Sequence, residues 1–259
     1  MINALATEFL KARRSRVPWV TALAFTVVAL VGGLFMFILQ DQGRARSLGL
    51  LGAKAALVGG DADWPTYLSF LAQATAVGGM VVFGLVEIWV FGREFSQHTA
   101  KDLLALPTAR VTIVAAKFAV VVGWCLALVV QLLLLGLVIG ALLGLPGWSA
   151  AAALGGLVRI GGIAVMVALL TTPIAFAASA GRGYLPGVGV LISAVFCAQI
   201  VAALGYGQYF PWSVPALFSG LAGPEQSTPG GLGVTLVLLA GVAGAVATGI
   251  WWRQADQDR

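Results

Sequence analysis

The sequence has few charged residues. Only 10% of its 259 residues are Asp, Glu, Lys or Arg, against about 25% in soluble domains, so they are too few to cover a water-facing surface. Apolar residues make up 60% of the chain, the mean hydropathy is +0.98, and apolar runs reach about 20 residues, the length that crosses a hydrocarbon layer. These values exclude a secreted enzyme, a disordered chain and a soluble globule. They indicate a polytopic membrane protein.

Residues that would support catalysis are also missing. His98 is the one histidine, whereas a haem bundle needs paired histidines and a zinc protease needs an H-E-x-x-H motif. His98 lies in a charged connector and not at membrane depth, which excludes a serine-histidine intramembrane protease. No G-x-x-x-x-G-K-[ST] motif occurs, so the chain has no Walker A loop. We therefore expect no catalytic residue, no metal site and no cofactor bound by this chain.

The apolar runs predict an all-α integral membrane fold with six transmembrane helices in one domain, residues 1–259. The predicted spans are 17–39, 66–91, 111–143, 159–178, 188–204 and 231–252. Residues 1–16 have an apolar and a polar stripe at helical spacing, which predicts an interfacial helix; the alternative is the n-region of a signal peptide. Residues 149–158 predict a second, short interfacial helix, unless Arg159 lies inside one longer helix.

The basic residues favour one side of these spans. Of the 15 Lys and Arg residues, all except Arg44, Arg46, Lys54 and Arg159 fall on the side of the two chain ends. Since cytoplasmic loops carry the excess of Lys and Arg, we expect both termini in the cytoplasm. The basic residues flank apolar runs and form no patch, so we expect no nucleic acid partner.

The connector between the second and third predicted spans, residues 92–110, carries the most specific signal. Thr99 and Asp102 have the spacing of a helix capping box, and Pro107 ends the helix that they begin. Leu103, Leu104 and Leu106 would give this helix an apolar face. The pattern alone fits equally well a helix on which a protein docks and a helix that rests on lipid.

The connector resembles the motif of ABC-2 type exporter permeases, also called type II ABC exporters. Their pattern is Arg-Glu, then often Gly-Thr, a leucine pair, proline, a small residue, arginine and a lysine about seven residues later. The matching residues are Arg93, Glu94, Thr99, Leu103, Leu104, Pro107, Arg110 and Lys117. His98 stands where the family often has glycine, a departure that affects the geometry of the turn. The layout of spans agrees with the family over nearly the whole chain.

The resemblance implies that the connector is a coupling helix that fits a cleft on a separate cytoplasmic ABC ATPase. The implied coupling residues are Glu94, Phe95, Thr99, Lys101, Asp102, Leu103, Leu104 and Leu106. It further implies that ATP and Mg are bound by two copies of that ATPase, that a second permease copy completes a homodimer or heterodimer, and that the N-terminal helix lies beside the connector. The implied location is the cytoplasmic (inner) membrane of a prokaryote.

A few polar residues interrupt the predicted spans. Gln73, Thr75, Ser193 and Gln199 are candidates for a substrate path, although hydrogen bonding to a neighbouring helix is the simpler explanation for most of them. An apolar path between two copies would suit a hydrophobic or amphipathic substrate, with membrane lipid around it.

Glu87 is expected to pair with a cation such as Arg93 or Arg110 at the helix end.

Small residues recur every fourth position in two of the spans. Gly136, Gly140 and Gly144 form one stripe, and Gly241, Ala245 and Gly249 form the other. Such stripes favour close packing of helices inside one subunit over a seam between two.

The sequence is compatible with three functions. The first is an exporter permease driven by a partner ATPase, the second is a non-transporting membrane anchor or sensor for a cytoplasmic partner, and the third is a carrier or channel that needs no ATP. The resemblance favours the first.

Overall fold

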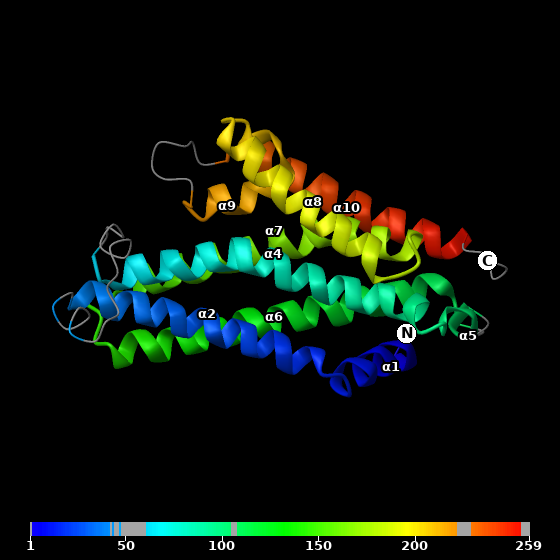
Figure 1. Cartoon of the computed structure of the whole chain (residues 1–259), viewed down its shortest axis with the longest axis horizontal. Helices are drawn as coiled ribbons and strands as arrows, with labels where there is room; N and C mark the ends of the chain where they lie inside the picture. The colour runs from blue at the N-terminus through cyan, green and yellow to red at the C-terminus, as the bar shows by residue number, and fades with distance from the viewer. Residues whose placement is uncertain are drawn as a thin grey trace.

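A computed structural model describes residues 2–41, 43, 47, 61–104, 108–221 and 229–254, with the side chains of Asp102 and Leu104 left out. Every regular element in these ranges is helical (Figure 1). The elements are α1 (Ile2–Arg13), α2 (Val17–Gln40), α4 (Trp64–Ser96), α5 (Ala100–Leu104), α6 (Arg110–Leu142), α7 (Ala150–Ala180), α8 (Tyr184–Ala203), η2 (Gly207–Tyr209), η3 (Pro211–Ser213), α9 (Val214–Phe218) and α10 (Gly231–Gln254).

Six of these helices are long and apolar enough to cross a membrane, which confirms the predicted all-helical fold and its six spans. They are α2, α4, α6, α7, α8 and α10. Many of their large apolar side chains are exposed, among them Leu30, Leu134 and Phe196. A helix that presents apolar residues to its surroundings and packs others inside a bundle is suited to lipid as its solvent.

The bundle is organised around α4 and α7. These two helices pack along each other, with α2 and α6 against α4 on one side and α8 and α10 against α7 on the other. Of the six spans, α4 is the most buried. Both described chain ends and α5 lie at the same end of the bundle, at the right of Figure 1, and we call this end the connector end. The opposite end, which carries α9, is the far end.

The prediction of a short interfacial helix before Arg159 is wrong, because α7 runs without a break from Ala150 to Ala180. The hydroxyl of Ser149 caps its first turn by accepting a hydrogen bond from the backbone N–H of Ala152 at 3.0 Å. A run of alanines follows, and alanine has the highest helix propensity of all residue types. Arg159 is accommodated because its guanidinium donates to the carbonyl oxygen of Phe218 at 3.2 Å, near the far end.

Small residues bring the long helices into close contact. A Cβ atom added at Gly136 or Gly140 of α6 would collide with Leu71 or Trp64 of α4, and one added at Gly241 of α10 would collide with Leu169 of α7. These glycines therefore serve packing inside the subunit, the alternative that the sequence favoured. At Gly144 and Gly249, an added Cβ would meet no atom of the described chain within 4 Å.

Pro173 lies inside α7, where its ring removes one backbone N–H donor. The carbonyl oxygen of Leu169, four residues earlier, lies 3.0 Å from the hydroxyl of Thr172. The same hydroxyl lies 2.5 Å from the carbonyl oxygen of Gly241 on α10. Thr172 therefore offers a hydroxyl donor to the carbonyl oxygen that Pro173 leaves without its backbone N–H, and it also joins α7 to α10. Membrane helices that contain proline need such a replacement donor.

Candidate functional site

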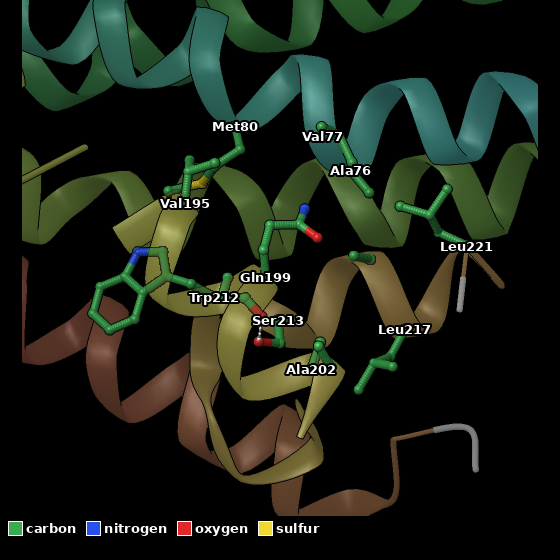
Figure 2. Close-up of a pocket in the computed structure, with 13 residues that line it drawn as sticks. Ala76, Val77, Met80, Val195, Gln199, Ala202, Trp212, Ser213, Leu217 and Leu221 are labelled. Carbon is green, nitrogen blue, oxygen red and sulfur yellow. Dashed lines mark hydrogen bonds between the residues drawn. The ribbon is translucent and has the colours of Figure 1, made fainter. Parts of the chain in front are cut away.

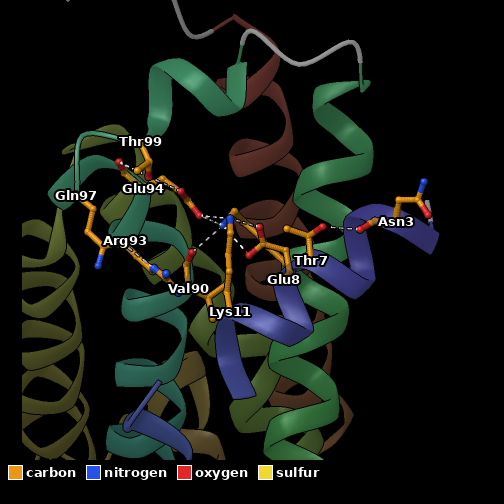
Figure 3. A network of polar contacts seen from close by, with 10 residues as sticks. Asn3, Thr7, Glu8, Lys11, Val90, Arg93, Glu94, Gln97 and Thr99 are labelled. Carbon is orange, nitrogen blue, oxygen red and sulfur yellow. Dashed lines mark hydrogen bonds and ion pairs between the residues drawn. The ribbon is translucent and has the colours of Figure 1, made fainter. Parts of the chain in front are cut away.

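Four charged side chains from three helices meet at the connector end of the bundle (Figure 3). Glu8 and Lys11 come from α1, Glu94 comes from the last turn and a half of α4, and Lys117 comes from the second turn of α6. Lys11 Nζ lies 2.7 Å from Glu8 Oε1 and 2.8 Å from Glu94 Oε1. Lys117 Nζ lies 3.1 Å from Glu8 Oε2 and 3.1 Å from Glu94 Oε1. We call these four residues the ion cluster.

Each polar atom of the ion cluster has a partner. The three N–H groups of Lys117 match three acceptors, the two carboxylates and the carbonyl oxygen of Val90 at 3.0 Å. Both oxygens of Glu8 accept from a lysine. In Glu94, Oε1 accepts from both lysines, and Oε2 accepts from the hydroxyl of Thr99 at 2.7 Å. The cluster is therefore formally neutral and fully hydrogen-bonded.

Such pairing is required because the cluster is buried. The side chain of Lys117 is completely buried, and those of Glu8 and Glu94 are less than a tenth exposed. An isolated charge at such a position would cost several kcal/mol in lost hydration. Burial of Lys11 acts to lower its pKa, but its hydrogen bonds to Glu8 and Glu94 more than offset this, and the pKa is raised. Lys11 therefore stays charged over the whole physiological range, and α1 stays paired with α4 and α6.

The connector is built differently from the single coupling helix that was predicted from Glu94 to Leu106. Glu94 and Phe95 lie on α4, which continues to Ser96, and the separate helix α5 has only five residues. The continuation is stabilised by the contacts of these two side chains. Glu94 enters the ion cluster, and the ring of Phe95 packs on Trp251 and Trp252 of α10 with centroids 5.5 and 5.6 Å away. Phe95 is thus half-buried by its own chain.

A tight turn joins α4 to α5. His98 has φ of +57°, in the left-handed region that glycine adopts most easily. The motif that the connector resembles often has glycine at this position, which fits a backbone in the left-handed region. The turn brings Thr99 back to the ion cluster, where its backbone N–H also donates to the carbonyl oxygen of Glu94 at 2.9 Å.

The remaining connector residues divide into exposed and packed positions. Ser96, Gln97, His98 and Lys101 are exposed, whereas Leu103 is half-buried and packs against the core. Part of the predicted leucine face therefore packs against this chain itself, because the side chain of Leu103 contacts the core. Leu106, Pro107 and the side chains of Asp102 and Leu104 lie outside the described part of the chain.

The two motif arginines are not members of the ion cluster and make other contacts. Arg93 donates from Nε to Gln97 at 3.0 Å, and its guanidinium lies 5.0 Å from the ring centroid of Trp89. Arg110 donates to the carbonyl oxygen of Arg253 at 3.2 Å and so caps the end of α10.

Glu87 does not pair with Arg93 or Arg110, so that prediction is wrong. Both arginines are directed elsewhere by the contacts just described. Glu87 lies two turns deeper on α4, is 1% exposed, and its Oε1 has no hydrogen-bond partner among the described residues. It is the one described residue with a buried side-chain oxygen or nitrogen that lacks such a partner.

A cavity of about 230 Å³ lies toward the far end, between α4, α8 and the segment from η3 to α9 (Figure 2). Its walls are mostly apolar, with Ala76 and Met80 on α4 and Leu217 on α9. Figure 2 shows the amide of Gln199 between the α4 wall and Ser213. The hydroxyl of Ser213 is occupied by the carbonyl oxygen of Ala198 at 2.9 Å, whereas the Gln199 amide makes no hydrogen bond within the described residues.

The other three residues predicted for a substrate path lie outside this cavity. Thr75 is fully buried, and its hydroxyl donates to the carbonyl oxygen of Leu71 on its own helix at 2.8 Å. Gln73 is half-buried on α4, and Ser193 is exposed on α8. Of the four, the structure brings only Gln199 to the cavity wall.

The sequence did not predict the α1 half of the ion cluster. Glu8 and Lys11 read as the solvated face of an amphipathic helix, whereas the structure turns this face inward. One signal was available. Lys117 and Glu94 are charges near the ends of apolar spans, and such residues need partners of opposite sign.

Comparisons with known proteins agree with the family that the connector motif resembles. The family described as ABC-2 family transporter protein matches residues 4–198. The "Bacitracin transport permease protein BCRB" of Bacillus licheniformis is 27% identical over 181 residues, which cover 69% of this chain and 85% of that relative. No solved structure matches the chain.

We expect Lys117→Met to lower the free energy of unfolding by about 3–5 kcal/mol, because it leaves two buried carboxylates with one lysine. The measurement is SDS-induced unfolding of the purified chain in detergent. Lys101→Met is the matched control on an exposed lysine and should change stability by less than about 0.5 kcal/mol. Equal effects of the two substitutions would contradict a structural role for the cluster.

We expect His98→Gly to raise the free energy of unfolding by about 0.5–1 kcal/mol. Glycine removes the strain of a left-handed residue, about 1–2 kcal/mol, and the greater freedom of the unfolded chain offsets part of the gain. His98→Ala keeps the strained backbone and should give no gain. The same unfolding assay decides, and a gain in the alanine variant equal to that in the glycine variant would refute the turn geometry.

Proposed function

The chain belongs to the ABC-2 transporter family, and from that premise we propose that it is the membrane permease of an exporter driven by a separate cytoplasmic ATPase. As a family member with a transport permease among its relatives, it is a multi-pass transport subunit and not an enzyme. Membership also implies association with an ABC ATPase and with a permease partner. The proposal adds the direction of transport, the docking surface and the substrate class.

The observation that carries the proposal is the attachment of the connector to three helices. Thr99, at the start of the connector helix α5, bonds to Glu94, and Glu94 is paired with Lys11 of α1 and Lys117 of α6. A force applied to the connector therefore acts on α1, α4 and α6 together. This is what a permease needs if its energy comes from a motor on another chain.

We place the docking surface on the exposed part of the connector, around Gln97, His98 and Lys101. The connector end then faces the cytoplasm, with both termini, in agreement with the excess of Lys and Arg there. The membrane is the inner membrane of a prokaryote. Two copies of the partner ATPase bind ATP and Mg. This chain supplies the surface on which the ATPase acts.

The cavity beside α4 supports the proposal of a substrate path through this part of the bundle. Because α4 is one continuous helix, Glu94, which anchors the connector, and the cavity wall at Ala76 and Met80 belong to the same helix. About 21 Å separate Met80 from Glu94 at 1.5 Å per residue. The apolar walls and the amide of Gln199 suit a hydrophobic or amphipathic substrate. We propose that a second permease copy, identical or homologous, completes the path, and the bacitracin of the relative's name is one candidate substrate.

We expect a double variant, Gln97→Glu with Lys101→Glu, to abolish most substrate-stimulated ATP hydrolysis when the permease is reconstituted with its partner ATPase. Both residues are exposed, so the permease should fold and reach the membrane normally. The matched control is Arg16→Glu, a charge reversal at an exposed position outside the connector. Full coupling in the double variant would contradict docking at this surface.

Transport is measured in the same vesicles. ATP-dependent loss of substrate from the cytoplasmic side supports an exporter. Binding of the ATPase without any flux would instead show a membrane anchor or sensor, and flux in the absence of the ATPase would show an independent carrier.

A further inference from the structure

An apolar groove of about 730 Å³ lies between α1, α2 and α6, on the face of α1 opposite to Lys11. Its walls come from Leu5 and Phe9 of α1, Pro18 and Ala22 of α2, and Val120 and Leu128 of α6. The groove is separate from the cavity beside α4 and from the exposed part of the connector.

The floor of the groove is made of small residues on one stripe of α6. Ala119, Gly123 and Ala127 follow each other at four-residue spacing, and the groove continues to Gln131. From residue 119 to residue 131 the helix rises about 18 Å, so the groove extends from the connector end deep into the span. A Cβ atom added at Gly123 would meet no atom of the described chain within 4 Å, which shows that the floor is open at this point.

The polar side chains of the inner part of the groove are occupied by the protein itself. Gln131 donates to the carbonyl oxygen of Ala22 at 2.9 Å and to the hydroxyl of Thr26 at 2.8 Å. The indole N–H of Trp124 donates to the hydroxyl of Thr21 at 3.2 Å. An occupant of this part therefore needs apolar atoms.

The mouth of the groove carries one cation. Arg13 lines it at the end of α1, is exposed, and makes no ion pair within the described residues. Among the described residues, no acidic side chain lines the groove, and Glu8 points to the other side of α1 and into the ion cluster. The groove thus offers a long apolar floor with a single positive charge at the end where the membrane interface lies.

We propose that the groove binds one anionic phospholipid, with an acyl chain along the stripe of small residues on α6 and the phosphate at Arg13. The chemistry fits both parts, since apolar area and a basic residue at the interface contribute separately to the binding of acidic lipids. A second copy of the chain docked through the same face would instead bring a second Arg13 with no acidic partner. The lipid then fills the space between α1 and α6 and holds α1 against the span.

The test uses the purified full chain and native mass spectrometry with phosphatidylglycerol or phosphatidylcholine added. The wild-type chain should retain one phosphatidylglycerol in preference to phosphatidylcholine. Gly123→Leu fills the floor and should lower retention of phosphatidylglycerol about tenfold. Gly189→Leu is the matched control, because Gly189 on α8 is also exposed with no atom within 4 Å of an added Cβ. It should leave retention unchanged.

The charge is tested independently of the floor. Arg13→Gln should lower the preference for phosphatidylglycerol over phosphatidylcholine about fivefold and leave the retention of phosphatidylcholine unchanged. Because Arg13 is exposed, this variant also decides the question if Gly123→Leu fails to fold. Equal retention by the two leucine variants, or an unchanged preference in Arg13→Gln, would overturn the proposal. A change in oligomeric mass with Gly123→Leu would also overturn it, since the groove would then be filled by a second copy.

Discussion

The arrangement of the connector end depends on the rule that a buried charge needs a partner of opposite sign. Lys117 is completely buried, and this position is tolerable because two carboxylates and a backbone carbonyl surround its ammonium group. The two carboxylates come from different helices, so satisfying Lys117 fixes α1 and α4 against α6. Lys11 then balances the second negative charge. The position of the N-terminal helix is thus a consequence of electrostatic pairing as well as of apolar packing.

This constraint explains how a short connector is attached to a large bundle. The helix α5 has five residues and no core of its own, so its position depends on what holds it. Thr99 ties its start to Glu94, and Leu103 packs on the core. Glu94 belongs to the same unbroken helix as the cavity wall, so α4 is the link between connector and cavity that the proposed coupling requires.

The sequence predicted the elements that depend on local composition. The six spans follow from long apolar runs, and the structure confirms their number. The continuity of α7 was missed because Arg159 looked like a boundary, whereas a carbonyl oxygen from α9 satisfies it. The connector motif identified Glu94, Thr99 and Lys117. The α1 partners of Glu94 and Lys117 depend on tertiary packing, with 109 positions of sequence between Glu8 and Lys117, and no local pattern contains this. The expected pairing of Glu87 failed because Arg93 is turned to Gln97, and Glu87 Oε1 has no hydrogen-bond partner in the part of the chain that the structure describes.

We expect Glu8 and Lys117 to stabilise the protein as a pair across α1 and α6. A double-mutant cycle with Glu8→Gln and Lys117→Met, read from the unfolding free energy in detergent, tests it most directly. We predict that the double variant is more stable than the sum of the single losses implies, with a coupling energy of about 1–3 kcal/mol. Additive losses would mean that the two residues act independently, and would contradict the account.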